Sequence, residues 1–205
     1  MLRLEAQGIG KTFGGPWLFR GFNLSVGQGE CLALTGANGS GKSTLLQILW
    51  GFQRPSEGQV QLFRDDQALP REERPFAAAF SAPYLGVPDY LTGRQILTFH
   101  FAQRPGLVSV PQMLEEVGLH KVADGAFKHY SSGQKQRIRL ALALFADVQA
   151  YFLDEPCTNL DQAGIELYHR LLQPRLADSL VIIASNWDEE MRFAQRHLPV
   201  KASQA

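Results

Sequence analysis

The sequence predicts an α/β fold built on a mostly parallel sheet, with a small antiparallel β subdomain on the N-terminal side and an inserted α-helical subdomain. Residues 150–153 and 180–184 are continuous apolar runs, which are typical of parallel strands covered on both faces. A glycine-rich loop at 36–44 lies between a short apolar strand and an apolar-striped helix. The apolar spacing after Thr92 lengthens to the helical period. These observations together indicate an α/β core interrupted by helices.

The N-terminal part is expected to form short antiparallel strands. Apolar and polar residues alternate there, and glycine-containing turns at 14–16 and 27–29 close the alternating segments. The strands predicted in this part are residues 2–4, 22–26, 58–63 and 75–80.

Helices are expected between these strands and the later apolar runs. The predicted helices are residues 96–101, a second helix starting at Ser109, a strongly apolar helix at 133–145, and a crossover helix at 163–176. We expect residues 1–205 to form one domain. Its helical subdomain is about 81–145, and its core with the β subdomain is about 1–80 and 146–205.

Length and composition limit the class of protein. The 205 residues can bury one sizeable core. Lys plus Arg and Asp plus Glu balance at 20 each, so no bulk attraction to nucleic acid or to an anionic membrane is expected. No run approaches the length of a membrane span and the N-terminus is not a signal peptide, which indicates a soluble, cytoplasmic chain. Cys31 and Cys157 are too few for a disulfide framework, and small buried residues are expected there, with a redox-sensitive Cys157 as the alternative.

The loop at 36–44 fits the phosphate-loop pattern G-x-x-x-x-G-K-[ST] at every fixed position. Glycines let backbone N–H groups approach a phosphate, Lys42 supplies a charge for the β and γ oxygens, and the Ser43 hydroxyl is expected to reach Mg²⁺. The alternative is a glycine-rich turn that merely links strand to helix. The predicted phosphate-binding residues are Gly36, Asn38, Gly39, Ser40, Gly41, Lys42, Ser43 and Thr44.

A second motif places two adjacent carboxylates at the end of the apolar run at 150–153. Because the carboxyl ends of such strands face the ligand crevice, Asp154 is expected to hold Mg²⁺ and Glu155 to act as general base on the attacking water. A solvated acidic pair is the alternative.

Residues 130–137, Tyr-Ser-Ser-Gly-Gln-Lys-Gln-Arg, directly precede the helix at 133–145. They resemble the signature Leu-Ser-Gly-Gly-Gln-x-Gln-Arg of ATP-binding cassette (ABC) proteins, and the resemblance extends over about residues 2–186. It implies a P-loop NTPase with a RecA-like core that binds ATP and Mg²⁺. It also implies a head-to-tail homodimer in which the phosphate loop of one copy faces the signature of the other. Ser131, Gly133 and Gln134 would then contact the γ-phosphate of the partner's ATP.

The resemblance assigns two further positions. Residues 158–161 resemble the loop whose aspartate lies at the dimer seam, although Asp161 also suits the N-cap of a helix. Phe13 matches the aromatic residue that stacks on adenine, whereas a lone aromatic is more often part of a core. Trp17 is a weaker candidate for the same surface.

The chain departs from the family at two positions. Ser81 aligns with the glutamine that contacts Mg²⁺ at the entry to the helical lobe, and Asn186 aligns with the histidine that touches the γ-phosphate. An asparagine can hydrogen-bond a phosphate, but it carries no charge. Hydrolysis is still expected because Lys42, Asp154 and Glu155 are retained.

The expected function is therefore that of the ATPase subunit of an ABC transporter. ATP binding would close the dimer and hydrolysis would reopen it. A separate membrane permease would dock near residues 81–101, where Tyr84, Leu85, Tyr90 and Leu91 are available, and would hold the subunit at the inner face of the cell membrane. With its short end at 195–205, the chain looks similar to compact exporter ATPases, including the haem-exporter type of cytochrome c maturation. The alternatives are a soluble cassette ATPase in iron–sulfur assembly and a nucleotide-gated binding module with little turnover.

Overall fold

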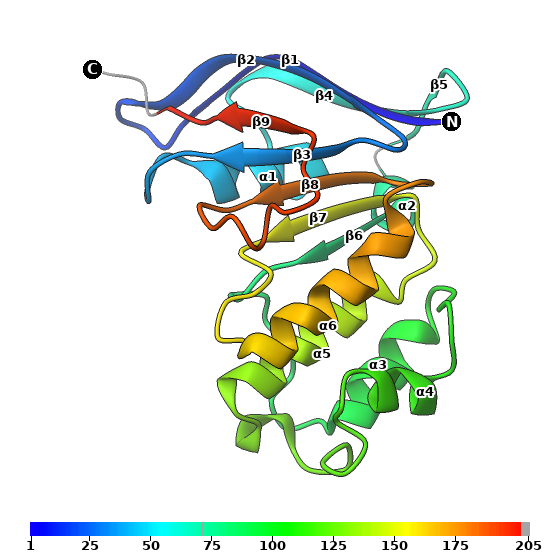
Figure 1. Ribbon diagram of the computed structural model, residues 1–205. Coiled ribbons are helices and arrows are strands. Elements are labelled where there is room, and N and C mark those ends of the chain that lie inside the picture. Colours follow the sequence, from blue (N-terminus) through cyan, green and yellow to red (C-terminus); the bar gives the residue numbers. More distant parts are fainter. Residues whose placement is uncertain (71, 202–205) are drawn as a thin grey trace.

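The computed structural model describes residues 1–70 and 72–201, and it confirms the predicted α/β class. The described residues form an antiparallel sheet and a parallel sheet, stacked in the upper part of the molecule, with most of the helices below them (Figure 1). The antiparallel sheet has the order β2 (Trp17–Gly27), β1 (Leu2–Thr12), β4 (Glu57–Arg64) and β5 (Gln67–Ala68). The parallel sheet has the order β6 (Ala78–Ser81), β7 (Ala150–Asp154), β8 (Leu180–Ala184), β3 (Cys31–Thr35) and β9 (Arg196–Pro199).

Helices connect the strands of the parallel sheet and cover its two faces. They are α1 (Lys42–Trp50), α2 (Arg74–Ala77), α3 (Gly93–Phe101), α4 (Val110–Glu116), α5 (Ser132–Leu144) and α6 (Gln162–Leu172), with 3₁₀ turns at Phe127–His129 and Gln173–Arg175. Among the described residues, no helix has the length and apolarity that a membrane crossing needs.

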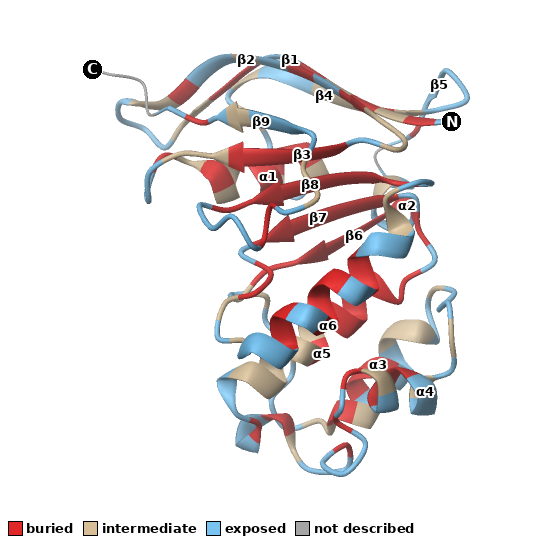
Figure 2. Cartoon of the chain, in the orientation of Figure 1, coloured by how far each residue is buried: buried red, intermediate tan, exposed pale blue. Residues whose placement is uncertain are grey.

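The strands of the parallel sheet send alternate side chains into two cores. Leu32, Leu34 and Ile182 pack with α1 and the antiparallel sheet. Ala33 and Ile183 pack with α5, α6 and the helices beyond them. All five residues of β7 and of β8 are buried, as the red strands of Figure 2 show, so both faces of the sheet are covered. This double coverage is why the apolar runs in the sequence are continuous.

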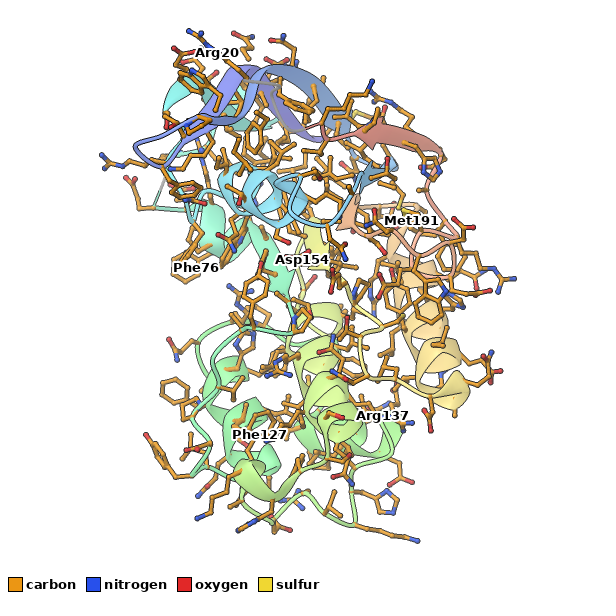
Figure 3. The ribbon with its side chains drawn as sticks, turned by 90° about the vertical axis from the view of Figure 1, so that its left-hand side faces the viewer. Arg20, Phe76, Phe127, Arg137, Asp154 and Met191 are labelled. Atoms are coloured by element: carbon orange, nitrogen blue, oxygen red, sulfur yellow. The ribbon has the colours of Figure 1, made fainter. Side chains whose placement is uncertain are left out.

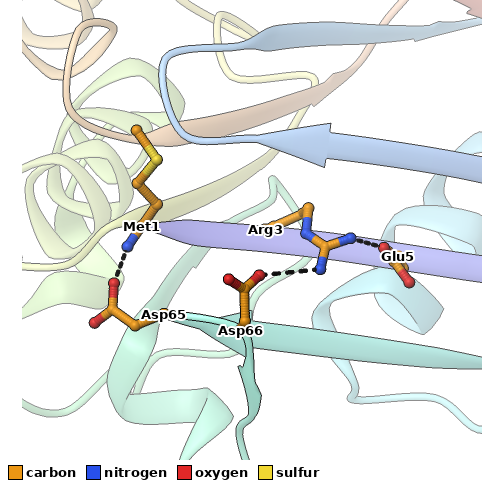
Figure 4. Close-up of polar contacts among 5 residues, drawn as sticks. All are labelled: Met1, Arg3, Glu5, Asp65 and Asp66. Atoms are coloured by element: carbon orange, nitrogen blue, oxygen red, sulfur yellow. Dashed lines mark hydrogen bonds and ion pairs between the residues drawn. The ribbon is translucent and has the colours of Figure 1, made fainter.

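Polar contacts join the N-terminal end of β1 to the turn that follows β4 (Figure 4). The Met1 amino group bonds the Asp65 carboxylate, and Arg3 contacts Glu5 and, at 3.5 Å, Asp66. These groups are largely exposed, so the ion pairs contribute little to stability. They nevertheless mark where the start of β1 meets the turn between β4 and β5.

The structure corrects several predicted boundaries. Residues 74–77 are helical, because Pro75 suits the first turn of a helix, and the strand there begins only at Ala78. β1 and β2 are each 11 residues long and continue past the short segments expected, with register shifts along their pairing. β9 was not predicted, since its residues alternate weakly and most are exposed at the sheet edge.

Candidate nucleotide-binding site

The phosphate loop curls from β3 into α1, and its glycines are required by the geometry. Gly36 has φ 139°, and a Cβ there would lie 2.3 Å from the Val200 carbonyl oxygen. Gly41 has φ 98°, and a Cβ there would lie 2.9 Å from the Leu18 side chain. The first N–H groups of α1, which starts at Lys42, have no acceptor within the helix. The loop therefore presents donors to an anion at a helix N-terminus.

Lys42 lies over its own loop. It is only 6% exposed, and its Nζ donates to the carbonyl oxygens of Gly36 at 2.8 Å and of Ala37 at 3.3 Å. These neutral acceptors can be exchanged for phosphate oxygens, which offer a charge as well. A hollow of about 320 Å³ opens at this point, and its lining brings together Leu18, Asn38, Gly39, Gly41, Lys42, Ser43, Thr44 and Glu155.

Asp154 ends β7 beside this hollow and is 1% exposed. Its Oδ1 accepts the Ser43 hydroxyl at 3.0 Å, and its Oδ2 accepts the Tyr84 hydroxyl at 2.6 Å. Burial raises the pKa of Asp154, and the hydrogen bonds from Tyr84 and Ser43 oppose that rise. In Figure 3, Asp154 lies at the level where the sheet meets the helical part.

The predicted magnesium ligands suit a hard divalent cation. Ser43 and Asp154 supply a hydroxyl and a carboxylate from two elements at hydrogen-bond distance. No group of three or more His, Cys, Asp or Glu side chains within 1–70 and 72–201 is arranged to hold a metal ion. One carboxylate with oxygen donors, completed by phosphate and water, is the arrangement in which Mg²⁺ is usually bound.

Glu155 follows Asp154 and lies at the rim of the hollow. Its φ is 41°, a left-handed value that few residues other than glycine adopt, and its carboxylate accepts the Thr158 hydroxyl at 3.4 Å. The side chain is exposed to solvent, so a water molecule can reach it. Position and access are those needed by a general base.

Asn186 contacts the phosphate loop directly. Its Oδ1 accepts the Gly36 N–H at 3.2 Å, and its Nδ2 donates to Asn38 Oδ1 at 3.1 Å. Asn186 is thus placed against the residues predicted to bind phosphate.

Ser81, by contrast, is fully buried at the end of β6, and its hydroxyl has no partner among the described residues. The residue that reaches Asp154 from this part of the chain is Tyr84, which the sequence analysis assigned to a docking surface. The sequence offered no periodic signal for this contact, because Tyr84 lies in an irregular segment.

The signature residues lie apart from the phosphate loop. Ser131 caps α5 and accepts the Gln134 N–H at 3.2 Å, while Gln134 Oε1 accepts the Ser131 N–H at 2.9 Å. Both line a polar hollow of about 420 Å³ with Gly133, Arg137 and Asp161, and no residue is common to this lining and that of the phosphate-loop hollow. Arg137 is drawn well below Asp154 in Figure 3.

Asp161 does serve as the N-cap of α6. Its Oδ1 accepts the Gly164 N–H at 2.8 Å and also pairs with Arg137 at 3.0 Å. The Arg137 pair joins the start of α6 to α5.

The candidate adenine contacts lie in and after the turn between β1 and β2. Phe13 is 68% exposed, and Lys11 Nζ lies over its ring, 4.8 Å from the centroid. Trp17 is engaged instead by the Arg20 guanidinium, 4.5 Å from its ring centroid.

A buried carboxylate that was not predicted from the sequence connects the loop after β7 to the loop after β8. Glu190 is 3% exposed, and its Oε1 accepts the Cys157 N–H at 2.7 Å. Its other oxygen accepts the Ser185 hydroxyl, whose oxygen accepts the Trp187 N–H at 2.9 Å. Glu190 therefore connects the loop that carries Glu155 to the loop that carries Asn186. Cys157 itself is 2% exposed, and burial raises the pKa of its thiol, which favours the small buried residue expected over a redox-sensitive one.

Comparisons with known proteins extend over most of the chain. The family described as "ABC transporter" matches residues 19–158. The cytochrome c biogenesis ATP-binding export protein CcmA of Brucella abortus is 32% identical over 189 residues, covering 90% of this chain and 85% of the relative. CcmA of Paramagnetospirillum magneticum is 36% identical over 202 residues, covering 93% and 91%.

Solved structures share the fold. The ATP-binding subunit of an ABC transporter has a TM-score of 0.85 and 21% identity, covering 97% of this chain and 85% of that one. An ATP-binding cassette solved as a dimer in a post-hydrolysis state with ADP and Pi has a TM-score of 0.82 and 23% identity, covering 97% and 94%.

Proposed function

Since this chain belongs to the ABC transporter family as an ATP-binding ATPase subunit, we propose that it hydrolyses ATP at the site around Lys42, Asp154 and Glu155 to drive export through a separate membrane subunit. The observation that carries the proposal is the contact of Ser43 with the buried Asp154, beside Lys42 and within the reach of Glu155. Phosphoryl transfer to water requires a hydroxyl and a carboxylate for the cation, an ammonium for the phosphates and a base that water can reach.

The proposed reaction uses these groups in order. The loop N–H groups and Lys42, released from its carbonyl acceptors, hold the phosphates. Glu155 accepts a proton from the attacking water, and the positive ends of the loop dipoles stabilise the charge on the transferred phosphoryl group. Mg²⁺, held by Ser43 and Asp154, would neutralise charge on the β and γ oxygens. Asn186 holds the loop at Gly36 and Asn38 through neutral hydrogen bonds.

We further propose that the site is completed by a second copy of the chain, arranged head to tail. Ser131, Gly133 and Gln134 form a separate polar hollow at the N-terminus of α5, where an anion is favoured. A γ-phosphate bound to the partner's loop would supply that anion. The helical part, about residues 81–145, would then move as a subdomain relative to the core.

The proposed membrane contact is an apolar groove of about 510 Å³ beside β6 and α3. Its lining is almost entirely apolar, and Tyr90 and Phe99 are 74% and 68% exposed. Burial and Arg104 lower the pKa of the groove's His100 to about 4, so that side chain is neutral at cellular pH. An exposed apolar surface of this kind suits a contact with the membrane subunit, and this contact would hold the chain at the inner face of the cell membrane. Because the CcmA relatives are export proteins of cytochrome c biogenesis, we propose that process for this chain.

The test of turnover is ATP hydrolysis by the purified chain and by Glu155→Gln, with Glu166→Gln on the exposed face of α6 as matched control. Loss of a general base lowers turnover by about 10²–10⁴-fold. The control should hydrolyse at the wild-type rate. Equal rates for wild type and Glu155→Gln, with the membrane subunit present, would refute the role of Glu155.

The test of the membrane contact is fractionation of cells that express the chain. Phe99→Asp, in the groove, should move the protein from the membrane to the soluble fraction. Phe76→Asp, on α2 and 66% exposed, is the matched control and should stay with the membrane. A wild-type chain found only in the soluble fraction would favour the soluble cassette ATPase instead.

A further inference from the structure

Tyr84 hydrogen-bonds the carboxylate of Asp154, to which the proposed cation would bind. Its hydroxyl donates to Asp154 Oδ2 at 2.6 Å and accepts from Gln47 Nε2 at 2.9 Å. With Ser43 on Oδ1 at 3.0 Å, both oxygens of Asp154 already accept hydrogen bonds. Tyr84 as a whole is 54% exposed, yet its hydroxyl reaches inward to a residue that is 1% exposed.

A buried carboxylate without a direct ion pair needs such donors. Lys42 Nζ bonds the Gly36 and Ala37 carbonyls rather than Asp154, so the hydroxyls of Ser43 and Tyr84 are the groups that stabilise the charge directly. A divalent cation on Asp154 would do the same more strongly. Ser43 can follow the cation as a ligand, whereas the Tyr84 hydroxyl presents a proton to the oxygen that a cation would use.

We propose that Tyr84 is a placeholder for the divalent cation: its hydroxyl satisfies Asp154 whenever no cation is bound to that carboxylate, and it is displaced when Mg²⁺ enters with the nucleotide. The proposal rests on the proposed ATP site, but it assigns to Tyr84 a role that the site does not require. Tyr84 is thus a positioning residue, acting through Asp154 rather than on the substrate.

Displacement of Tyr84 would loosen one end of the segment at residues 82–91. At its far end, the Asp89 and Leu91 carbonyls accept N–H groups of Lys128 and Phe127, both at 2.8 Å. At its near end, the polar side-chain contact to the nucleotide site is that of Tyr84, and the Leu85 carbonyl accepts Arg139 Nε at 3.3 Å. The same segment lines the apolar groove with Leu85, Val87, Pro88, Tyr90 and Leu91. Entry of the cation would therefore change one wall of the groove.

The first test compares Tyr84→Phe with Tyr90→Phe, a tyrosine of the same segment whose hydroxyl makes no hydrogen bond among the described residues. Affinity for a non-hydrolysable ATP analogue is measured by calorimetry, with Mg²⁺ and with EDTA. The advantage that Mg²⁺ gives is the ratio of the affinity with Mg²⁺ to the affinity with EDTA. Removing the Tyr84 hydroxyl should increase this ratio by about tenfold, the size of effect that one hydrogen bond to a charged acceptor produces. Tyr90→Phe should keep the wild-type ratio.

The second test follows hydrogen–deuterium exchange of residues 82–91. In the wild type, exchange should rise when Mg²⁺ is added to the nucleotide-bound protein, and in Tyr84→Phe it should be high before Mg²⁺ is added. Gln47→Leu is a second variant for the case that Tyr84→Phe folds poorly. It removes the donor to the Tyr84 hydroxyl without changing residues 82–91, and exchange before Mg²⁺ is added should rise in it by less than in Tyr84→Phe.

An unchanged or reduced advantage from Mg²⁺ in Tyr84→Phe and in Gln47→Leu would overturn the proposal, because Tyr84 would then support the cation rather than compete with it. Normal nucleotide binding in that experiment would leave the proposed function intact. A wild-type chain that binds no nucleotide would overturn both.

Discussion

Replacing Glu190 with alanine removes the group that joins the loop after β7 to the loop after β8. The substitution leaves the Cys157 N–H and the Ser185 hydroxyl without their acceptor in a region where the carboxylate was 3% exposed. Glu189→Ala is the matched control, because its carboxylate is 52% exposed and lies 4.0 Å from His169 Nε2.

The decrease in the free energy of unfolding of Glu190→Ala can be calculated approximately from these contacts. A hydrogen bond to a charged group contributes about 1.5–3 kcal/mol, and an unsatisfied buried donor costs about 1–3 kcal/mol. Relief of the buried charge, which is reflected in the raised pKa of Glu190, offsets part of this loss. We expect a net decrease in the free energy of unfolding of about 3 kcal/mol, which lowers the Tm of a chain of this size by roughly 6–12 °C.

The assay is urea unfolding followed by tryptophan fluorescence, with differential scanning calorimetry for Tm and ATP turnover measured at a temperature where both variants are folded. Glu190→Ala should lose turnover as well as stability, since Glu155 and Asn186 sit on the loops that it joins. Equal unfolding midpoints for Glu190→Ala and Glu189→Ala would refute the reasoning, because they would show that the buried contacts contribute nothing net.

Three further predictions concern the loop, its packing and the groove. Lys42→Ala should weaken ATP binding by about 10³-fold, given roughly 4 kcal/mol for a charge pair at 4 Å, and calorimetry showing unchanged affinity would contradict its contact with phosphate. Gly36→Ala should lower Tm by several degrees because its Cβ would meet the Val200 carbonyl at 2.3 Å, whereas Gly15→Ala, with open space around it, should not. The pKa of His100 is lowered from 6.5 to about 4 in the folded chain, mainly by burial. The free energy of unfolding should therefore be highest above pH 6.5 and should fall as the pH decreases from 6.5 towards 4. His100→Gln should flatten this part of the pH dependence of the urea midpoint, and a profile parallel to wild type would count against it.

The fold class could be predicted because its signals are local. The apolar runs that became β7 and β8 and the glycine loop before α1 each need only a few neighbouring residues to be recognised. The residues of the phosphate loop were predicted in the same way, and the structure places Lys42, Ser43, Asp154 and Glu155 around one hollow or in contact with its lining.

What the sequence missed depends on contacts between distant segments. Tyr84 reaches Asp154 across 70 positions, and no period or spacing announces such a contact. Glu190 lies in a polar stretch that is typical of a solvated loop, and only its burial and the hydrogen bonds of its two oxygens reveal its role. β9 is recognisable by its pairing with β3 rather than by its own composition.

The two strands that pair with β3 also determine when, during synthesis, the phosphate loop can fold. β3 and the loop are made early, but the strands on either side of β3 are β8 and β9, and Val200 donates its N–H to the Thr35 carbonyl at 2.7 Å. During synthesis from the N-terminus, β3 therefore waits without its lateral partners until residues 180–200 have left the ribosome. Contacts of such large sequence separation are slow to form, so the loop is expected to be among the last parts of the nascent chain to gain protection from proteases.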